Sequence, residues 1–222
     1  MSFNALNATV FESKSNFYFA EFEDILYKII LCYNFMTTDK VSLINDENSI
    51  RNIILSNYLK VERFKVLFGL TNYLFDKEIE EDTGRIDIRI MPINPFLNDD
   101  AYYIIECKRI DNTNIDGTTG LNAKYIENGI CRFITEKYPS YYQTNGMIGF
   151  VVEPIDIHKN TQSINKLLRQ EFLNACTKQE LTYKEIHPQF KHSYYSRHTI
   201  FNKTIILYHL MLDFSGNIKI KE

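Results

Sequence analysis

Two stretches decide the fold of this chain: Gly84-Arg85-Ile86-Asp87-Ile88-Arg89-Ile90 and, after a proline-containing loop, Tyr102-Tyr103-Ile104-Ile105-Glu106-Cys107-Lys108. β-Branched and aromatic residues dominate both stretches and turn residues bound them, which is typical of β-strands. Because strand side chains alternate between two faces, Glu106 and Lys108 point the same way. Burying charged groups inside apolar strands costs free energy unless the charges are compensated. We therefore expect Asp87 and Glu106 to hold a divalent metal ion.

The pairing of Gly84-Arg85-Ile86-Asp87 with Ile105-Glu106-Cys107-Lys108 resembles the catalytic signature of the PD-(D/E)XK phosphodiesterase superfamily. The resemblance implies a restriction-endonuclease-like core: a helix, two or three antiparallel strands, a helix, and then another strand. Residues 43–154 can be aligned with that order of helices and strands. Ile86 stands where the superfamily's name-giving proline would be, a position that varies among its members.

The tripeptide Glu-x-Lys is not diagnostic alone, since Glu12-Ser13-Lys14 repeats it in a polar stretch. The context of Glu106 differs, because an apolar strand leads into it and Asp87 precedes it in strand register. The alternative is a cross-strand ion pair between Asp87 and Lys108, with Glu106 solvated at a sheet edge.

A third carboxylate, Glu47, opens an expected helix whose N-cap is Asn45 or Asp46. Glu47 lies three residues before Ile50, on the same inward face. In the superfamily, this helix often adds an acidic residue to the metal site. An ordinary first-turn glutamate favoured by the helix dipole explains the position equally well.

The resemblance implies a magnesium site, with manganese able to substitute, formed by Asp87, Glu106, Glu47 and the backbone carbonyl of Cys107. Carboxylate and carbonyl oxygens are the ligands that Mg²⁺ prefers, and the bound ion would polarise a phosphate and acidify a water. Lys108 would position or deprotonate the attacking water and help neutralise charge in the transition state.

Three basic residues are candidates for contacts with substrate phosphates. Arg85 shares the strand of Asp87, while Lys124 and Arg132 lie on the polar side of an expected helix over 122–138. Solvated surface charges are the alternative interpretation of these positions.

The 222 residues suit a single domain with a 1–42 N-terminal helical segment, a 43–154 nuclease core and a 155–222 extension. We expect a mixed α/β (α+β) fold, in which a central mixed sheet is flanked by helices. Beyond the core lie an N-terminal helix and a C-terminal helix plus β-hairpin. The expected helices cover 18–36, 46–60, 122–138 and 161–180, and the further expected strands cover 73–80, 147–152 and 204–214. The hairpin is expected to turn at 215–217.

The segment 182–203 interleaves basic residues with aromatic ones, including Tyr183, Lys184, Tyr195 and Arg197. This composition suits base stacking and phosphate contact, or an ordinary solvated loop. The net charge of −3 gives no global basic footprint, so tight passive binding of nucleic acid is not indicated.

The four cysteines form no Cys-x-x-Cys pair and suit free thiols in a reducing compartment. The N-terminus lacks the pattern of a signal peptide, and no apolar segment is long enough to span a membrane. We therefore expect a cytoplasmic protein without a membrane partner. A zinc site from His187, His192, His198 and Cys176 would match no common ligand spacing.

Together these features predict a magnesium-dependent DNA endonuclease, a class that by family resemblance often serves restriction or phage defence. Two alternatives stay open: a non-catalytic nucleic-acid-binding or assembly subunit of the same fold, and an RNA-directed nuclease. DNA is the expected partner. Cutting both strands of a duplex would favour a two-fold homodimer. The resemblance to a class that serves phage defence also allows a larger defence complex as a partner.

Overall fold

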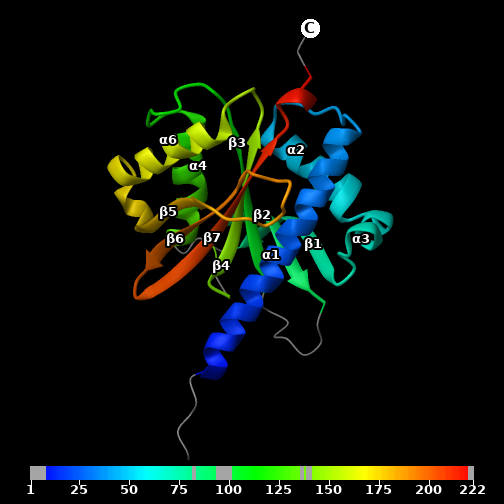
Figure 1. Ribbon diagram of the computed structural model, residues 1–222, viewed down its shortest axis with the longest axis horizontal. Coiled ribbons are helices and arrows are strands. Elements are labelled where there is room, and N and C mark those ends of the chain that lie inside the picture. Colours follow the sequence, from blue (N-terminus) through cyan, green and yellow to red (C-terminus); the bar gives the residue numbers. More distant parts are fainter. Residues whose placement is uncertain (1–8, 82–83, 94–101, 136–137, 139–141, 220–222) are drawn as a thin grey trace, which may run out of the picture.

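A computed structural model describes residues 9–81, 84–93, 102–135, 138 and 142–219. Its centre is a seven-stranded sheet in the order β1-β2-β3-β4-β7-β6-β5 (Figure 1). The strands are β1 (Tyr73–Glu81), β2 (Gly84–Pro92), β3 (Tyr103–Ile110), β4 (Thr144–Val151), β5 (Thr177–Tyr183), β6 (Ser193–Ile200) and β7 (Lys203–Asp213). The pairs β3–β4 and β4–β7 are parallel and all others are antiparallel, so the predicted mixed α/β class with a mixed sheet is confirmed.

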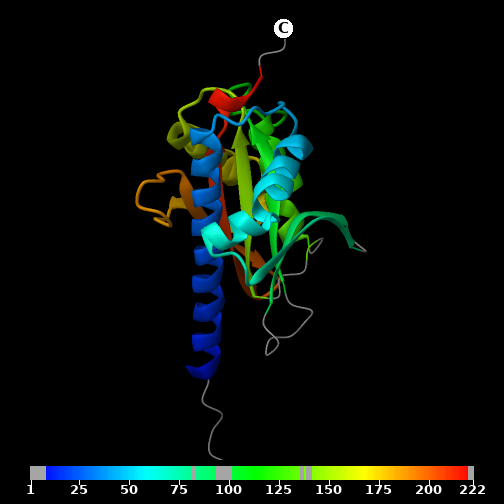
Figure 2. The same cartoon turned by 90° about the vertical axis from the view of Figure 1, so that its right-hand side faces the viewer.

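Helices cover both faces of the sheet (Figure 2). One face carries α1 (Thr9–Thr38), α2 (Glu47–Ile54), the π-helical turn η1 (Leu55–Leu59) and α3 (Glu62–Phe68). The other carries α4 (Leu121–Tyr125), the π-helical turn η2 (Ile126–Ile130), α5 (Cys131–Ile134), α6 (Ile157–Gln170) and the 3-10 turn η3 (Leu173–Ala175). None of the helices in the described part of the chain combines the length and the apolar character that crossing a bilayer requires.

Each face has its own hydrophobic core, because strand side chains alternate between the two sides of the sheet. Phe22 of α1 and Ile105 of β3 belong to one core, while Ile104 of β3, Ile130 of η2 and Leu167 of α6 belong to the other. Residues 47–151 thus run as α2, η1 and α3, the three antiparallel strands β1, β2 and β3, the helical segments α4, η2 and α5, and β4 parallel to β3.

The prediction of one helix over 161–180 was wrong, because α6 ends at Gln170 and β5 begins at Thr177. Cys176 adopts a left-handed backbone conformation, with φ of 47°, which a continuing helix does not allow. All four cysteines are free as expected; Cys176 is exposed and the other three are buried.

The C-terminal hairpin exists but is built from other residues than predicted. β6 and β7 form it, with Ile200 opposite Lys203, and Ser215–Asn217 is a short 3-10 turn, η4. Ile218 after this turn makes an isolated parallel bridge with Leu43. Within the segment 182–203, Ser193–Ile200 forms β6, which pairs with β7 and extends the central sheet, whereas residues 184–192 form a loop.

Candidate active site

The strands β2 and β3 separate just where their charged residues meet. Their register pairs Ile88 with Ile105, which would place Asp87 opposite Glu106 one step further on. At that point the backbone N–H of Cys107 donates instead to Oδ2 of Asp87, at 2.9 Å. The side chain of Asp87 thus replaces a backbone acceptor and lies between the two strands.

The ammonium group of Lys108 is the centre of the site. Its Nζ lies 2.7 Å from Oε1 of Glu106, 2.7 Å from the carbonyl oxygen of Cys107 and 3.1 Å from Oε1 of Glu47. Oδ2 of Asp87 is 3.8 Å away. The residues predicted from sequence as ligands and catalytic lysine therefore converge on one point, although Glu47 and Lys108 are 61 positions apart.

Glu47 reaches this point because α2 begins there. The Asp46 side chain caps the helix by accepting from the N–H of Ser49, at 2.8 Å. With its start fixed, the first turn directs Glu47 at β3, where Oε2 also accepts from the backbone N–H of Arg109, at 3.1 Å. Glu47 is thus both a first-turn glutamate and a member of the cluster.

Two arginines complete the charge pattern. Nη1 of Arg51 lies 2.5 Å from Oδ1 of Asp87, and Nη1 of Arg132 lies 2.8 Å from Oε1 of Glu106. Three carboxylates thus face three cations. We call this set the carboxylate cluster; it comprises Glu47, Asp87, Glu106, Arg51, Lys108 and Arg132.

Glu106 is fully buried within an interior strand, so the alternative of a solvated glutamate at a sheet edge is wrong. The hydroxyl of Tyr138 donates to its Oε2, at 2.7 Å, and accepts from Arg132, also at 2.7 Å. The ion pair between Asp87 and Lys108 that the same alternative proposed does exist, as part of this larger network.

Sequence reasoning missed Arg51 and Tyr138. Arg51 had a readable signal, because it follows Glu47 by one helical turn and must face the same strands. Tyr138 had none, since its contact with Glu106 depends on how the chain returns after α5.

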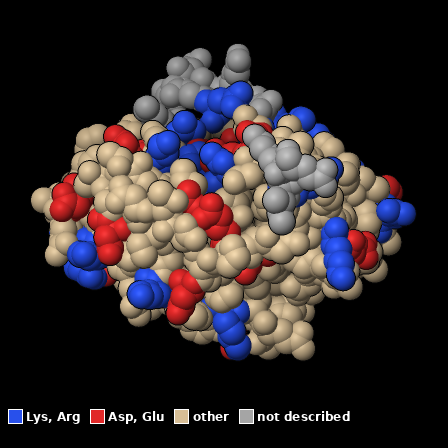
Figure 3. All heavy atoms as spheres, turned by 90° about the horizontal axis from the view of Figure 1, so that it is seen from above, with Lys and Arg blue, Asp and Glu red and all other residues tan. Residues whose placement is uncertain are grey.

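The three predicted substrate contacts lie in different settings. Arg85 and Lys124 are exposed, on β2 and α4, while Arg132 is half-buried and turned onto Glu106. Seen from above, Lys and Arg side chains gather around a hollow in whose floor acidic atoms are visible (Figure 3). Basic side chains are thus gathered on part of this face, although the net charge is −3.

Burial and the neighbouring charges of opposite sign act in opposite directions on the pKa of Glu106 and on that of Lys108. Burial, and then the neighbouring Asp87, raise the pKa of Glu106 to about 7, although Lys108 and Arg132 act against this. Burial lowers the pKa of Lys108, but the surrounding carboxylates outweigh it and raise the pKa above its ordinary value. Lys108 is therefore a cation at neutral pH.

The donor chemistry fits a hard divalent ion, because oxygen atoms of Glu47, Asp87, Glu106 and Cys107 already surround one cationic atom. Across residues 9–81, 84–93, 102–135, 138 and 142–219, no three His, Cys, Asp or Glu side chains are grouped to hold a metal by themselves. In the cluster, bound lysine and arginine groups separate the carboxylates. Glu47, Asp87, Glu106 and the Cys107 carbonyl are the groups that would hold a metal ion.

The backbone behind Lys108 is packed closely. A Cβ on Gly129 of η2 would lie 2.4 Å from Cε of Met147 and 3.6 Å from Cγ of Lys108. Glycine thus lets this turn approach β3 and β4. The π-helical turns η1 and η2 adjoin the helices that carry Arg51 and Arg132, and such turns are frequent at functional sites.

A second buried polar network is neutral. Nδ1 of His198 lies 2.8 Å from the carbonyl of Ala175, so it must donate, and its Nε2 must accept from Ser196, at 2.8 Å. Oγ of Ser196 then accepts from Nε2 of His209, at 2.7 Å, and Nδ1 of His209 accepts from the hydroxyl of Tyr125, at 2.8 Å. We call this series the histidine chain. Each group has one assigned direction of donation.

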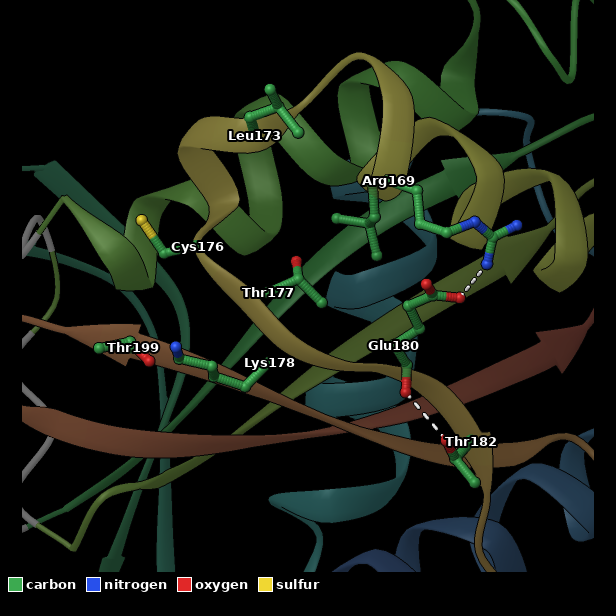
Figure 4. A pocket seen from close by; sticks show the side chains of 9 residues that line it. Arg169, Leu173, Cys176, Thr177, Lys178, Glu180, Thr182 and Thr199 are labelled. Atoms are coloured by element: carbon green, nitrogen blue, oxygen red, sulfur yellow. Dashed lines mark hydrogen bonds and ion pairs between the residues drawn. The ribbon is translucent and has the colours of Figure 1, made fainter.

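A cavity of about 760 Å³ lies elsewhere. It is an open cleft between the end of α6, η3 and β5, lined by Leu173, Lys178, Thr199 and others, and the ion pair of Arg169 with Glu180 crosses it (Figure 4). None of its lining residues belongs to the carboxylate cluster.

Comparison of the chain with protein-family models, with curated proteins and with solved structures finds no match. The geometry of the carboxylate cluster is therefore the principal evidence on function.

Proposed function

We propose that this protein is a metal-dependent endonuclease that hydrolyses phosphodiester bonds of DNA. One observation carries the proposal: Glu47, Asp87, Glu106 and Lys108, chosen from sequence on a catalytic resemblance, meet around a single atom, Lys108 Nζ. The cluster is also accessible from the surface, since the Arg132 side chain is 34% exposed and the Glu47 side chain 30%.

Asp87, Glu106, Glu47 and the Cys107 carbonyl would hold the metal ion. When bound, the ion would polarise the scissile phosphate and lower the pKa of a water molecule. Lys108, displaced from the carboxylates, would donate hydrogen bonds to the phosphate or to the attacking water. Arg132 would turn from Glu106 toward the same phosphate and stabilise the negative charge that develops on it.

A second candidate is a non-catalytic binding or assembly subunit. It is favoured by the charge balance, because three carboxylates and three cations already neutralise one another. Such a network would need neither metal nor substrate.

The two candidates differ in what Lys108→Met does. The purified protein is incubated with linear, supercoiled and single-stranded DNA and with RNA, in magnesium, manganese or EDTA. We expect metal-dependent DNA cleavage that Lys108→Met reduces by on the order of 10³-fold. Lys166→Met, which removes a half-exposed lysine of a surface ion pair, is the matched control and should cleave normally.

Circular dichroism and thermal melting of both variants accompany the assay. No cleavage by the wild-type protein on any polymer, together with a lower melting temperature for Lys108→Met, would favour the non-catalytic candidate. Cleavage confined to RNA would reassign the substrate.

A further inference from the structure

Asp87 is held by cations from two sides. Its Oδ1 faces Nη1 of Arg51 at 2.5 Å, whereas its Oδ2 faces the N–H of Cys107 at 2.9 Å and Nζ of Lys108 at 3.8 Å. A carboxylate in a two-metal site shares its oxygens between two ions about 4 Å apart. Here a guanidinium group occupies one of those two sides.

The three cations of the carboxylate cluster differ in how readily they can leave. The side chains of Arg132 and Lys108 are 34% and 10% exposed, but that of Arg51 is 0% exposed. Arg51 lies on α2 between Ile50 and Ile54, which are both buried in the hydrophobic core. It cannot turn to solvent without moving the helix, and arginine does not lose its charge by deprotonation.

We infer that the Arg51 guanidinium takes the place of a second metal ion beside Asp87, so that each chain binds one divalent cation, on the Oδ2 side. The inference rests on the proposed function, because it concerns how many ions the proposed metal site admits. A second divalent ion at Oδ1 would meet a fixed positive charge within van der Waals reach, in a site where burial weakens screening. Arg51 is in this sense a positioning residue that sets the metal count.

Manganese binding tests the inference without reference to activity. The wild-type protein is titrated with Mn²⁺, and free Mn²⁺ is counted from its electron paramagnetic resonance signal. We expect one ion per chain. Two ions would overturn the inference and leave the proposed nuclease site standing, whereas zero ions would overturn both.

Arg51→Met then asks whether the guanidinium sets the count. We expect two ions per chain for this variant, and any other count would contradict the inference. Arg132→Met is the matched control, because it also removes one cation from the cluster but not from Asp87; it should still bind one ion. If Arg51→Met does not fold, Arg51→Gln, which can still donate a hydrogen bond to Asp87, takes its place in the same titration.

Discussion

The carboxylate cluster and the histidine chain are both buried polar networks, yet they satisfy their groups in opposite ways. The cluster sets three carboxyl groups against three cations. The histidine chain avoids charge: burial lowers the pKa of His198 to about 4 and that of His209 well below its ordinary range, and it raises the pKa of Tyr125.

The difference shows which network can support chemistry. In the histidine chain every donor has one acceptor, and Ser196, His198 and His209 are 0% exposed, so any rearrangement leaves a buried group unsatisfied. In the carboxylate cluster, Lys108 and Arg132 can exchange a carboxylate for another anion and remain paired. A buried cation can exchange one anion for another only where the second anion can enter the site from solvent.

The largest expected effect separates the two networks by activity. Asp87→Asn should reduce DNA cleavage by 10³-fold or more, because it removes a charged oxygen from the proposed metal site. The rate of plasmid nicking in magnesium measures this. Asp116→Asn, at an exposed surface aspartate paired with Lys166, should cleave like the wild type. Equal activity of both variants would remove Asp87 from the site.

The second effect is on stability alone. Ser196→Ala removes the centre of the histidine chain and leaves Nε2 of His198 and Nε2 of His209 without partners. We expect a loss of about 2–6 kcal/mol in the free energy of unfolding, since each of the two unsatisfied buried groups costs about 1–3 kcal/mol. Denaturant titration measures the loss, and cleavage per folded molecule should not change. A fall in the cleavage per folded molecule would show that the histidine chain affects the carboxylate cluster.

The third prediction uses opposite pH dependences. Between pH 4.5 and about 7 the folded chain holds more protons on Glu106 than the unfolded chain, so the contribution of Glu106 to stability falls as pH rises. Between about pH 4 and 6.5 the unfolded chain holds more protons on His198, so the contribution of His198 rises with pH. The two slopes partly cancel in the wild type.

Variants separate these slopes. The free energy of unfolding of Glu106→Gln should rise more steeply with pH than that of the wild type, by at most about 3 kcal/mol over pH 4.5 to 7. His198→Gln should rise less steeply than the wild type over the lower part of that range. Denaturant titrations at four pH values suffice, and parallel curves for Glu106→Gln and wild type would show that Glu106 titrates normally.

The smallest effect concerns packing behind Lys108. Gly129→Ala would push Cε of Met147 aside, which a flexible side chain allows at about 1 kcal/mol, and would place the new Cβ in van der Waals contact with Cγ of Lys108, at 3.6 Å. We expect a several-fold loss of cleavage in a steady-state assay. Gly216→Ala, where a Cβ meets nothing within 4 Å, is the control. Equal cleavage rates for the two variants would mean that Lys108 tolerates the added methyl group.

More of the candidate site than of the residues around it could be predicted from the sequence. Asp87, Glu106 and Lys108 could be found because strand alternation and the superfamily resemblance give each a position, and Glu47 because helix starts have recognisable caps. The spacing from Glu47 places Arg51 on the same helix face, but the sequence does not show that this face meets a carboxylate 36 positions away.

In the C-terminal region, the secondary structure could also be predicted only in part from the sequence. The apolar spacing of α6 was readable, but its end depends on the left-handed conformation of Cys176, a residue type that seldom adopts it. The strand β6 was concealed by its basic and aromatic composition, and only pairing with β7 explains it.

The confinement of Lys108 also affects how this residue meets reagents. An ammonium held by carboxylates, with a raised pKa and a side chain only 10% exposed, is a poor nucleophile. Acylating reagents should therefore label exposed lysines such as Lys124 and pass over Lys108. Any ligand that draws the carboxylates away from it would make this amine newly reactive, and mass spectrometry of the labelled peptides would record the opening of the site residue by residue.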